Sequence, residues 1–247
     1  MTKLYGIIGN PVTHSFSPDY FSEKFHKQGL PYRYERFQLA KISELKDVLK
    51  ANPNLVGFNV TSPFKESILP YVSELSPEAQ ELQAVNTVVR KGDSLIGYNT
   101  DVIGFDKTIS GLSFGKKGCL VLGTGGASKA VVYVLQQRNL PFKRVSRTKS
   151  IGGLTYDNIN AEVLRQFPVI INTTPLGMMN RMNEKPMLPY QHIGVDHVLI
   201  DLVYKPRTTA FLEEGLSRGA RIKNGFQMLV EQAEASWKIW SSNDEKL

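Results

Sequence analysis

Apolar and polar residues alternate along the first hundred positions with two different periods. Short apolar runs and a two-residue alternation indicate strands, and apolar residues three or four positions apart indicate helices between them. The strands predicted in this way are residues 3–9, 32–39, 55–60, 84–90 and 94–98. The last two flank Lys91-Gly92-Asp93 and predict a hairpin. The first hundred residues are therefore expected to form an α/β unit.

Helices are predicted between these strands. Ser17 is expected as the N-cap of the first helix and Pro18 as its first helical residue, because proline has no N–H to leave unsatisfied there. A second helix is expected to begin at Ser43, and residues 78–82 predict a short third one. The turn after the hairpin, Asn99-Thr100-Asp101, is expected to close it.

A second alternating pattern begins near Gly118. Its predicted strands are residues 119–122, 142–145, 169–172 and 198–203, with a short strand before Asn224, and its predicted helices are residues 130–135, 161–167 and 209–216. Strands that alternate with helices predict parallel βαβ units and a doubly wound sheet. Residues 226–240 predict a last amphipathic helix, with Trp237 and Trp240 in the core.

A glycine-rich loop joins the first strand and helix of the second pattern, in the sequence VLGTGGAS from Val121 to Ser128. Glycines at this place let the backbone approach a pyrophosphate, and the following helix offers N–H groups at its positive end. Gly123 and Gly125 fit the pattern G-x-G-x-x-G, whereas Ser128 stands at its third glycine. The loop predicts a dinucleotide site, and a plain tight turn is the alternative.

The end of the next strand indicates which dinucleotide binds. NAD sites usually place an acid there for the ribose 2′-hydroxyl. The stretch Val145-Ser146-Arg147-Thr148-Lys149 has no acid, and Arg147 and Lys149 suit a 2′-phosphate. NADP is therefore the favoured cofactor, with a solvated surface arginine as the alternative for Arg147.

Composition narrows the class of protein. Apolar residues make up 41% of the chain and charged residues 21%, as in folded globular proteins. The net charge of +7 is spread along the sequence without a basic stripe, so an anionic substrate and cofactor are favoured over nucleic acid. The single cysteine, Cys119, and the lack of a signal peptide or long apolar stretch predict a cytoplasmic protein without a membrane segment. Four histidines without paired spacing predict no metal site.

Several short motifs occur in one order: GNPVTHSFSP, NVTSPFK, AVNT, NTD, GTGGAS, NTTPLGM, DLVYKP and NGFQMLVEQA. Over nearly the whole chain this order resembles the shikimate dehydrogenase family. The resemblance implies reversible, NADPH-dependent reduction of 3-dehydroshikimate to shikimate, in the biosynthesis of chorismate and aromatic amino acids. It implies an N-terminal α/β catalytic domain and an inserted Rossmann-type domain. The expected division is residues 1–101 for substrate, 102–224 for NADP, and 225–247 returning to the catalytic domain.

The resemblance also implies roles for single residues. Lys65 and Asp101 would be the catalytic pair. The substrate would be bound by Ser15, Ser17, Thr61, Asn86, Tyr204 and Gln232, with the two serines on its carboxylate. The cofactor would be bound by Gly123, Thr124, Gly125, Gly126, Ala127, Ser146, Arg147, Thr148, Leu202 and Gly225. Residues 172–174 would pass beside it. Without the resemblance, Ser17 is a helix cap, Asp101 a turn or capping residue and Lys65 a surface charge.

These residue types suit the implied chemistry. Reduction of a ketone develops negative charge on oxygen, which the ammonium of Lys65 can stabilise and protonate. Hydroxyls and amides suit a polyol, because a site built to bond each hydroxyl rejects analogues that lack one. Whether Lys65 acts alone as general acid is left open. The only binding partner expected besides the cofactor is the small-molecule substrate. The protein is expected to be a monomer or a homodimer.

Three departures and three alternatives remain. The chain is short for the family, the region after Arg147 is compressed, and residues 178–189 (MMNRMNEKPMLP) are unusual. A dehydrogenase that also accepts quinate and NAD is the nearest alternative. A methylenetetrahydrofolate dehydrogenase-like enzyme gives no reason for the Ser15 and Ser17 pair with Lys65 and Asp101. A non-catalytic nucleotide sensor would be favoured if either of the last two were replaced.

Overall fold

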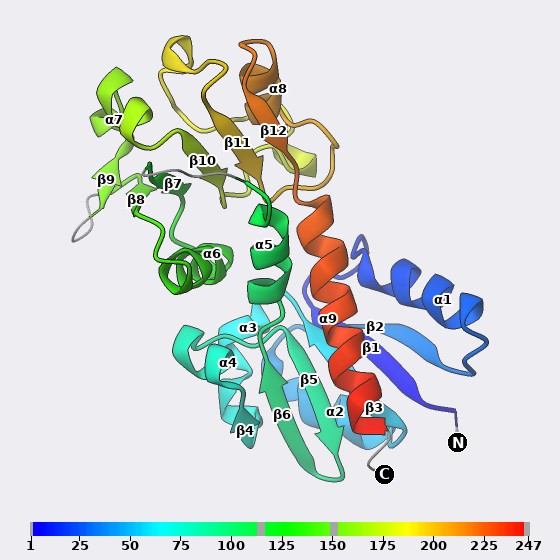
Figure 1. The fold of residues 1–247 in the computed structure, drawn as a ribbon. Helices are drawn as coiled ribbons and strands as arrows, with labels where there is room; N and C mark the ends of the chain where they lie inside the picture. Colours follow the sequence, from blue (N-terminus) through cyan, green and yellow to red (C-terminus); the bar gives the residue numbers. More distant parts are fainter. Residues whose placement is uncertain (1, 113–116, 149–152, 245–247) are drawn as a thin grey trace. The chain divides into compact units, whose positions relative to one another are not determined.

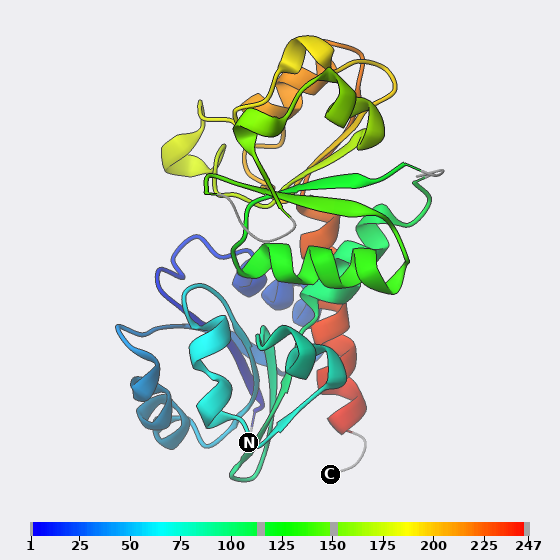
Figure 2. The ribbon, with the colours of Figure 1, turned by 90° about the vertical axis from the view of Figure 1, so that its left-hand side faces the viewer.

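The computed structural model describes residues 2–112, 117–148 and 153–244, and Figures 1 and 2 show two views of it. The chain divides into two compact units. The first unit is Met1–Thr100 with Ala233–Leu247, and the second is Asp101–Gln232. The division expected from the sequence, at residues 101 and 224, stays a prediction. Among the described residues, no helix combines the length and apolar character that crossing a membrane requires.

The first unit is built on a sheet of six strands in the order β2-β1-β3-β5-β6-β4. The strands are β1 (Leu4–Gly9), β2 (Arg33–Gln38), β3 (Leu55–Val60), β4 (Glu74–Leu75), β5 (Thr87–Lys91) and β6 (Ser94–Tyr98). β1 runs parallel to both β2 and β3, whereas β5 runs antiparallel to β3 and β6. The α/β class and the hairpin predicted from the sequence are confirmed.

Helices cover both faces of this sheet (Figure 1). They are α1 (Ser17–Lys27), α2 (Leu45–Ala51), α3 (Phe64–Ser67), α4 (Pro77–Leu82) and the later part of α9 (Phe226–Asp244), with short 3-10 turns at η1 (Ile42–Glu44) and η2 (Leu69–Tyr71). Because successive side chains of a strand point to opposite faces, Leu4 and Ile8 pack with α2 to α4, and Tyr5 and Ile7 pack with α1 and α9.

The C-terminal helix α9 belongs to this core through Trp240. The Trp240 side chain is 2% exposed, and its indole N–H donates to the carbonyl oxygen of Val88 over 3.0 Å. A Cβ atom at Gly57 would stand 2.5 Å from the indole nitrogen, so glycine leaves the space that the ring fills. The predicted core role of Trp240 is confirmed.

The expected N-cap role of Ser17 is wrong. Helix α1 includes Ser17, its N-cap is Phe16 in the right-handed helical region, and no side chain caps the helix. Ser17 is 6% exposed, and its side chain is hydrogen-bonded to Tyr34 rather than to an N–H group of the helix. Pro18 does lie in the first turn, where its missing N–H costs nothing.

The second unit is a doubly wound sheet of six parallel strands in the order β12-β11-β10-β7-β8-β9. The strands are β7 (Cys119–Leu122), β8 (Phe142–Ser146), β9 (Leu154–Thr155), β10 (Val169–Asn172), β11 (Val198–Asp201) and β12 (Arg221–Lys223). The chain starts in the middle, winds outward through β8 and β9, and then crosses to β10 on the other side of β7. This order is that of Rossmann-type dinucleotide-binding folds.

Helices cover both faces of this sheet too (Figure 2). They are α5 (Asp101–Ile109), α6 (Gly126–Gln137), α7 (Ala161–Gln166), α8 (Ala210–Leu216) and the beginning of α9, with 3-10 turns η3 (Tyr156–Asn158), η4 (Met179–Arg181) and η5 (Tyr190–His192). Side chains of α7 and α8 pack with Leu120, Ile170 and Leu199 in one cluster. The Rossmann-type domain predicted from the sequence is confirmed.

Candidate functional site

The glycine loop lies between β7 and α6, at the carboxyl end of the sheet. Gly123 has φ +108°, and a Cβ atom there would stand 2.8 Å from Oγ1 of Thr173, so the position requires glycine. Gly125 and Gly126 meet nothing within 4 Å on the side where a Cβ would project. The start of α6 is therefore open to a group that approaches its N–H donors closely, as a pyrophosphate does.

Ser128, which stands at the third glycine of the motif, has a structural role. It is fully buried, and its hydroxyl donates to the carbonyl oxygen of Gly125 over 2.7 Å. Its backbone N–H bonds the same oxygen over 3.0 Å. A serine at this position thus closes the first turn of α6 and keeps the loop in shape, so the incomplete motif leaves the loop geometry intact.

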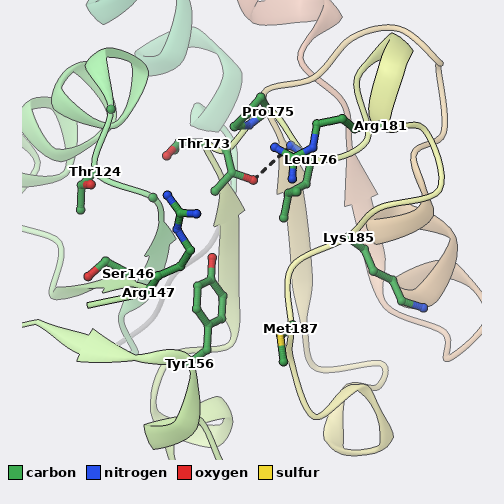
Figure 3. A pocket seen from close by; sticks show the side chains of 13 residues that line it. Thr124, Ser146, Arg147, Tyr156, Thr173, Pro175, Leu176, Arg181, Lys185 and Met187 are labelled. Carbon is green, nitrogen blue, oxygen red and sulfur yellow. Dashed lines mark hydrogen bonds between the residues drawn. The ribbon is translucent and has the colours of Figure 1, made fainter. Parts of the chain in front are cut away.

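A pocket of about 360 Å³ opens beside this loop (Figure 3). One wall carries the predicted residues Gly123, Thr124, Gly125, Ser146 and Arg147. Residues 173–176, after β10, line the other side. The pocket lies where the strand order reverses between β7 and β10, which is where open α/β sheets bind their ligands.

The pocket also contains residues that sequence reasoning missed. These are Tyr156, Pro175, Leu176, Arg181, Lys185 and Met187. Burial raises the pKa of Tyr156, and the charge of nearby Arg147 acts in the opposite direction. The unusual composition of residues 178–189 was the only signal for the last three.

Three predicted cofactor residues, Gly126, Ala127 and Thr148, lie next to the pocket lining in the chain rather than in it. Ala127 follows the loop in the first turn of α6, and Thr148 is exposed after β8, where its carbonyl oxygen accepts a hydrogen bond from Ser146. Lys149, the other basic residue considered for a 2′-phosphate, lies outside the described residues.

A buried network fixes the segment after β10. Asn172 accepts hydrogen bonds from the N–H and the hydroxyl of Thr174, over 3.0 and 2.6 Å. The Asn172 amide donates to Asp201 over 3.0 Å, and the Thr209 hydroxyl donates to the same carboxylate over 2.6 Å. Asp201 is fully buried, and burial raises its pKa to about 6 against the effect of these donors. The network therefore fixes the segment after β10, which lines the pocket.

In the first unit, a second buried network underlies the predicted substrate residues. The Tyr34 hydroxyl donates to Asn59 over 2.7 Å, and the Asn59 amide donates to Ser236 of α9 over 3.1 Å. Burial raises the pKa of Tyr34 well above its usual range, while the hydrogen bond with Ser17 acts against the rise. Sequence reasoning missed Tyr34 and Ser236 because neither belongs to the motifs quoted above.

Asn86 is held by the same network. Its side-chain oxygen accepts from the N–H of Thr100 over 2.7 Å, and from the hydroxyls of Thr100 and Thr87 over 3.1 and 3.0 Å. These three donors occupy the side-chain oxygen of Asn86 and fix the orientation of its amide group. The bonds to Thr100 also fix the residue that precedes Asp101.

The remaining predicted residues of the first unit lie on loops and helix starts around this network. Ser15 and Thr61 are half-buried, on the loops after β1 and β3. Lys65 is half-buried on α3, and its carbonyl oxygen accepts the N–H of Val85 over 2.7 Å. These three residues therefore lie on segments that directly follow strands of the sheet.

The other predicted residues lie in the second unit. Asp101 is the first residue of α5 and is 9% exposed. Gln232 is 8% exposed, and its amide donates to the carbonyl oxygen of Leu229 over 2.9 Å. Burial raises the pKa of Tyr204, just after β11.

Leu202 and Gly225, both expected near the nicotinamide, are brought together by the structure. A Cβ atom at Gly225 would stand 2.1 Å from the carbonyl oxygen of Leu202, so only glycine fits beside this backbone. The N–H of Gly225 also donates to Val203 over 3.1 Å. Across the described ranges, no group of three or more histidine, cysteine, aspartate or glutamate side chains is placed to hold a metal ion.

Comparison with known proteins identifies relatives over the whole chain. Residues 7–88 match the profile of the shikimate dehydrogenase substrate binding domain. A shikimate dehydrogenase (NADP(+)) of Bacillus subtilis is 37% identical over 272 residues, which cover 100% of this chain and 94% of that protein. The crystal structure of shikimate dehydrogenase from Aquifex aeolicus is 35% identical, with a TM-score of 0.85 over 98% of this chain and 93% of that one. A Thermus thermophilus shikimate 5-dehydrogenase, in complex with NADP(H) and shikimate, is 30% identical with a TM-score of 0.85 over 98% and 94%.

Proposed function

The chain belongs to the shikimate dehydrogenase family, and we propose that it catalyses the reversible, NADPH-dependent reduction of 3-dehydroshikimate to shikimate. The observation that carries the proposal is the pocket beside the glycine loop. The loop leaves open space at Gly125 and Gly126, and Arg147 stands at the end of β8 with no acid among the lining residues. An NADP molecule needs both features.

The described residues fit this cofactor. Gly123 to Ala127 would hold the pyrophosphate, Ser146, Arg147 and Thr148 the phosphorylated ribose, and Leu202 and Gly225 the nicotinamide end. When bound, the nicotinamide supplies or accepts the hydride. The chain itself must then hold the cofactor and the substrate in position and move one proton.

Substrate binding is assigned to a set of polar side chains. Ser15 and Ser17 bind the carboxylate, and Thr61, Asn86 and Gln232 bind the hydroxyls, with Tyr204 also facing the substrate. The buried network behind Ser17 and Asn86 supports this assignment, because it limits the positions that their side chains can take. A site built on such fixed donors and acceptors favours a polyol that satisfies each one.

Proton transfer is assigned to Lys65 and Asp101. During reduction the ketone oxygen gains negative charge, and the ammonium group of Lys65 stabilises this charge and donates a proton to the oxygen. In the reverse direction the neutral amine accepts the hydroxyl proton. Asp101 bonds the reacting hydroxyl group and keeps it oriented toward Lys65.

The first test measures NADPH formation by absorbance with purified protein, shikimate, and NADP or NAD in parallel. Lys65→Ala should lower kcat about 100- to 10,000-fold, the usual contribution of general acid–base catalysis. Lys46→Ala, an exposed lysine on α2 of the same unit, is the matched control and should retain full activity. Circular dichroism of each variant checks that it is folded.

Each outcome has a definite meaning. Shikimate-dependent NADPH formation that collapses in Lys65→Ala but not in Lys46→Ala supports the substrate, the cofactor and the catalytic lysine together. Equal turnover with NAD, or with quinate, would replace the proposal by a dehydrogenase of dual specificity. No turnover of either acid by folded wild-type protein would overturn it and favour the nucleotide-sensing alternative.

A further inference from the structure

The segment between β10 and η5 forms one wall of the proposed cofactor pocket. It contributes Arg181, Lys185 and Met187 to the lining, opposite Ser146 and Arg147 (Figure 3). Three backbone hydrogen bonds hold the turn at Arg181: its N–H donates to Met178 over 2.5 Å, and its carbonyl accepts from Gly177 and Glu184 over 3.0 and 2.9 Å. The turn therefore presents the Arg181 side chain from a defined place.

The charges that line the pocket are all positive. The thirteen lining residues shown in Figure 3 include two guanidinium groups and one ammonium group, and no carboxylate. The ammonium of Lys185 is bound by Glu214 and lies 5.2 Å from the ring centre of Tyr190. Arg147 and Arg181 therefore contribute two guanidinium groups to the same pocket, from opposite walls.

Arg181 is held by a carboxylate that an anionic ligand can replace. Its Nε and Nη2 atoms donate to the two oxygens of Glu184, over 2.8 and 2.6 Å. The Arg181 and Glu184 side chains are 45% and 50% exposed, and ion pairs exposed to this extent contribute little free energy. The same two donors match two oxygens of a phosphate. Within the described part of the chain, Nη1 has no partner, so it can donate as well.

We propose that Arg181 is a second cofactor-binding arginine, which contacts the 2′-phosphate of NADP(H) from the wall opposite Arg147 and so favours NADP over NAD. The proposal rests on the proposed function. The position of Arg147 at the end of β8 assigns this part of the pocket to the adenosine ribose, and Arg181 lines the same pocket. Glu184 competes with the phosphate for the guanidinium group.

Direct binding tests the proposal without turnover. Isothermal titration calorimetry would give Kd for NADP, NAD, adenosine 2′,5′-bisphosphate and AMP with wild type and R181Q. R181Q should weaken NADP and the bisphosphate about tenfold, as loss of a charge-assisted hydrogen bond does, and should change NAD and AMP less than about twofold. E184Q removes the carboxylate that competes for Arg181, so the Kd for NADP should fall about threefold. This change corresponds to the small free energy of an exposed ion pair.

The pair Arg165 and Glu162 of α7 provides matched controls. These side chains have the same spacing of three residues, with 3.9 Å between Nη2 and Oε2, and do not line the pocket. R165Q and E162Q should leave all four Kd values unchanged. The two pocket variants should change NADP affinity in opposite directions, which a purely structural ion pair would not do, since breaking it from either side has the same effect.

Three results would overturn the proposal. Equal weakening of NADP and NAD by R181Q would place the arginine on the pyrophosphate, and unchanged NADP affinity would remove it from the cofactor. Weaker NADP binding in E184Q would show that the pair acts as a structural brace. If wild type binds neither dinucleotide, the proposed function itself fails, which distinguishes the two failures.

Discussion

At the scale of single residues, the most informative side chain is Asp201, because its charge is buried. Its pKa of about 6 lies above the value of 3.8 for an unburied aspartate, and desolvation is the main cause. The folded state therefore binds a proton more tightly than the unfolded state. The free energy of unfolding contributed by this group is largest below about pH 4 and is lost as the pH rises to about 6.

Replacing Asp201 by asparagine should remove this dependence on pH. The unfolding free energy of wild type minus that of D201N should fall by about 2 kcal/mol between about pH 4.5 and pH 7.5, at about 1.4 kcal/mol per unit of pKa shift. Urea unfolding at several pH values measures it. D157N, which changes an exposed aspartate of η3, should give a flat difference. If the difference in unfolding free energy between wild type and D201N also stayed constant with pH, the raised pKa of Asp201 would be refuted.

Among single residues, sequence reasoning found those with a motif around them and missed those without one. Arg147 was predicted from its place after β8, and it lines the pocket. Tyr156 and Arg181 reach the same pocket from 3-10 turns, whose sequences have no period and no fixed distance from the glycine loop. Whether such residues reach the pocket depends on the tertiary fold, and a local sequence pattern carries no information about it.

At the scale of elements, some strands were predicted with the bounds that the structure has, whereas the fully buried β11 ends at Asp201 and not at residue 203. β3, β7 and β10 have the predicted bounds, because an apolar run of strand length ends at a polar or proline-containing segment. Helix α5 was not predicted from the sequence. A Cβ atom at Gly104 would stand 2.5 Å from the carbonyl oxygen of Met228, so the glycine permits close packing of α5 on α9. This packing role of Gly104 is visible only in the tertiary structure.

The strand β7, the glycine loop and α6 form the element on which cofactor binding depends. In Gly126→Ala the methyl group would project into open space at the start of a helix, so the fold should keep its melting temperature. The methyl would stand where the pyrophosphate is proposed, and NADP affinity should fall about tenfold, a loss of about 1.4 kcal/mol. Calorimetry and thermal unfolding measure the two effects.

Gly123→Ala is the contrasting variant of the same loop. It combines φ +108° with a Cβ contact of 2.8 Å to Thr173, so it should lower both the melting temperature and NADP affinity. If Gly126→Ala bound NADP as tightly as wild type, the pyrophosphate would not lie at this helix start. If Gly123→Ala were as stable as wild type, the loop would tolerate a side chain that the geometry excludes.

At the scale of the whole molecule, each compact unit has hydrophobic clusters of its own. Tyr5, Phe21 and Trp240 share a cluster of the first unit, and Leu199 and Phe211 share one of the second. Since the packing free energy of each cluster is contained in one unit, a cavity should weaken the unit that holds it more than the other. The first unit is made of two chain segments, and the second unit, Asp101–Gln232, connects them. Folding of the first unit must therefore bring together segments that are 132 residues apart in the sequence, which costs conformational entropy.

Trp240→Ala and Phe211→Ala test this separation as a pair, because both side chains are almost fully buried, at 2% and 1% exposure. Each should cost about 3–5 kcal/mol. In hydrogen exchange followed by mass spectrometry, Trp240→Ala should speed exchange in peptides from β1 and β3, and Phe211→Ala in peptides from β10 and β11. Uniform acceleration in both variants would mean that the chain unfolds as one cooperative body. The complementary pattern would mean that the second unit keeps its cofactor pocket when the first is loosened, so that NADP binding by Trp240→Ala should stay near the wild-type Kd while turnover of shikimate falls.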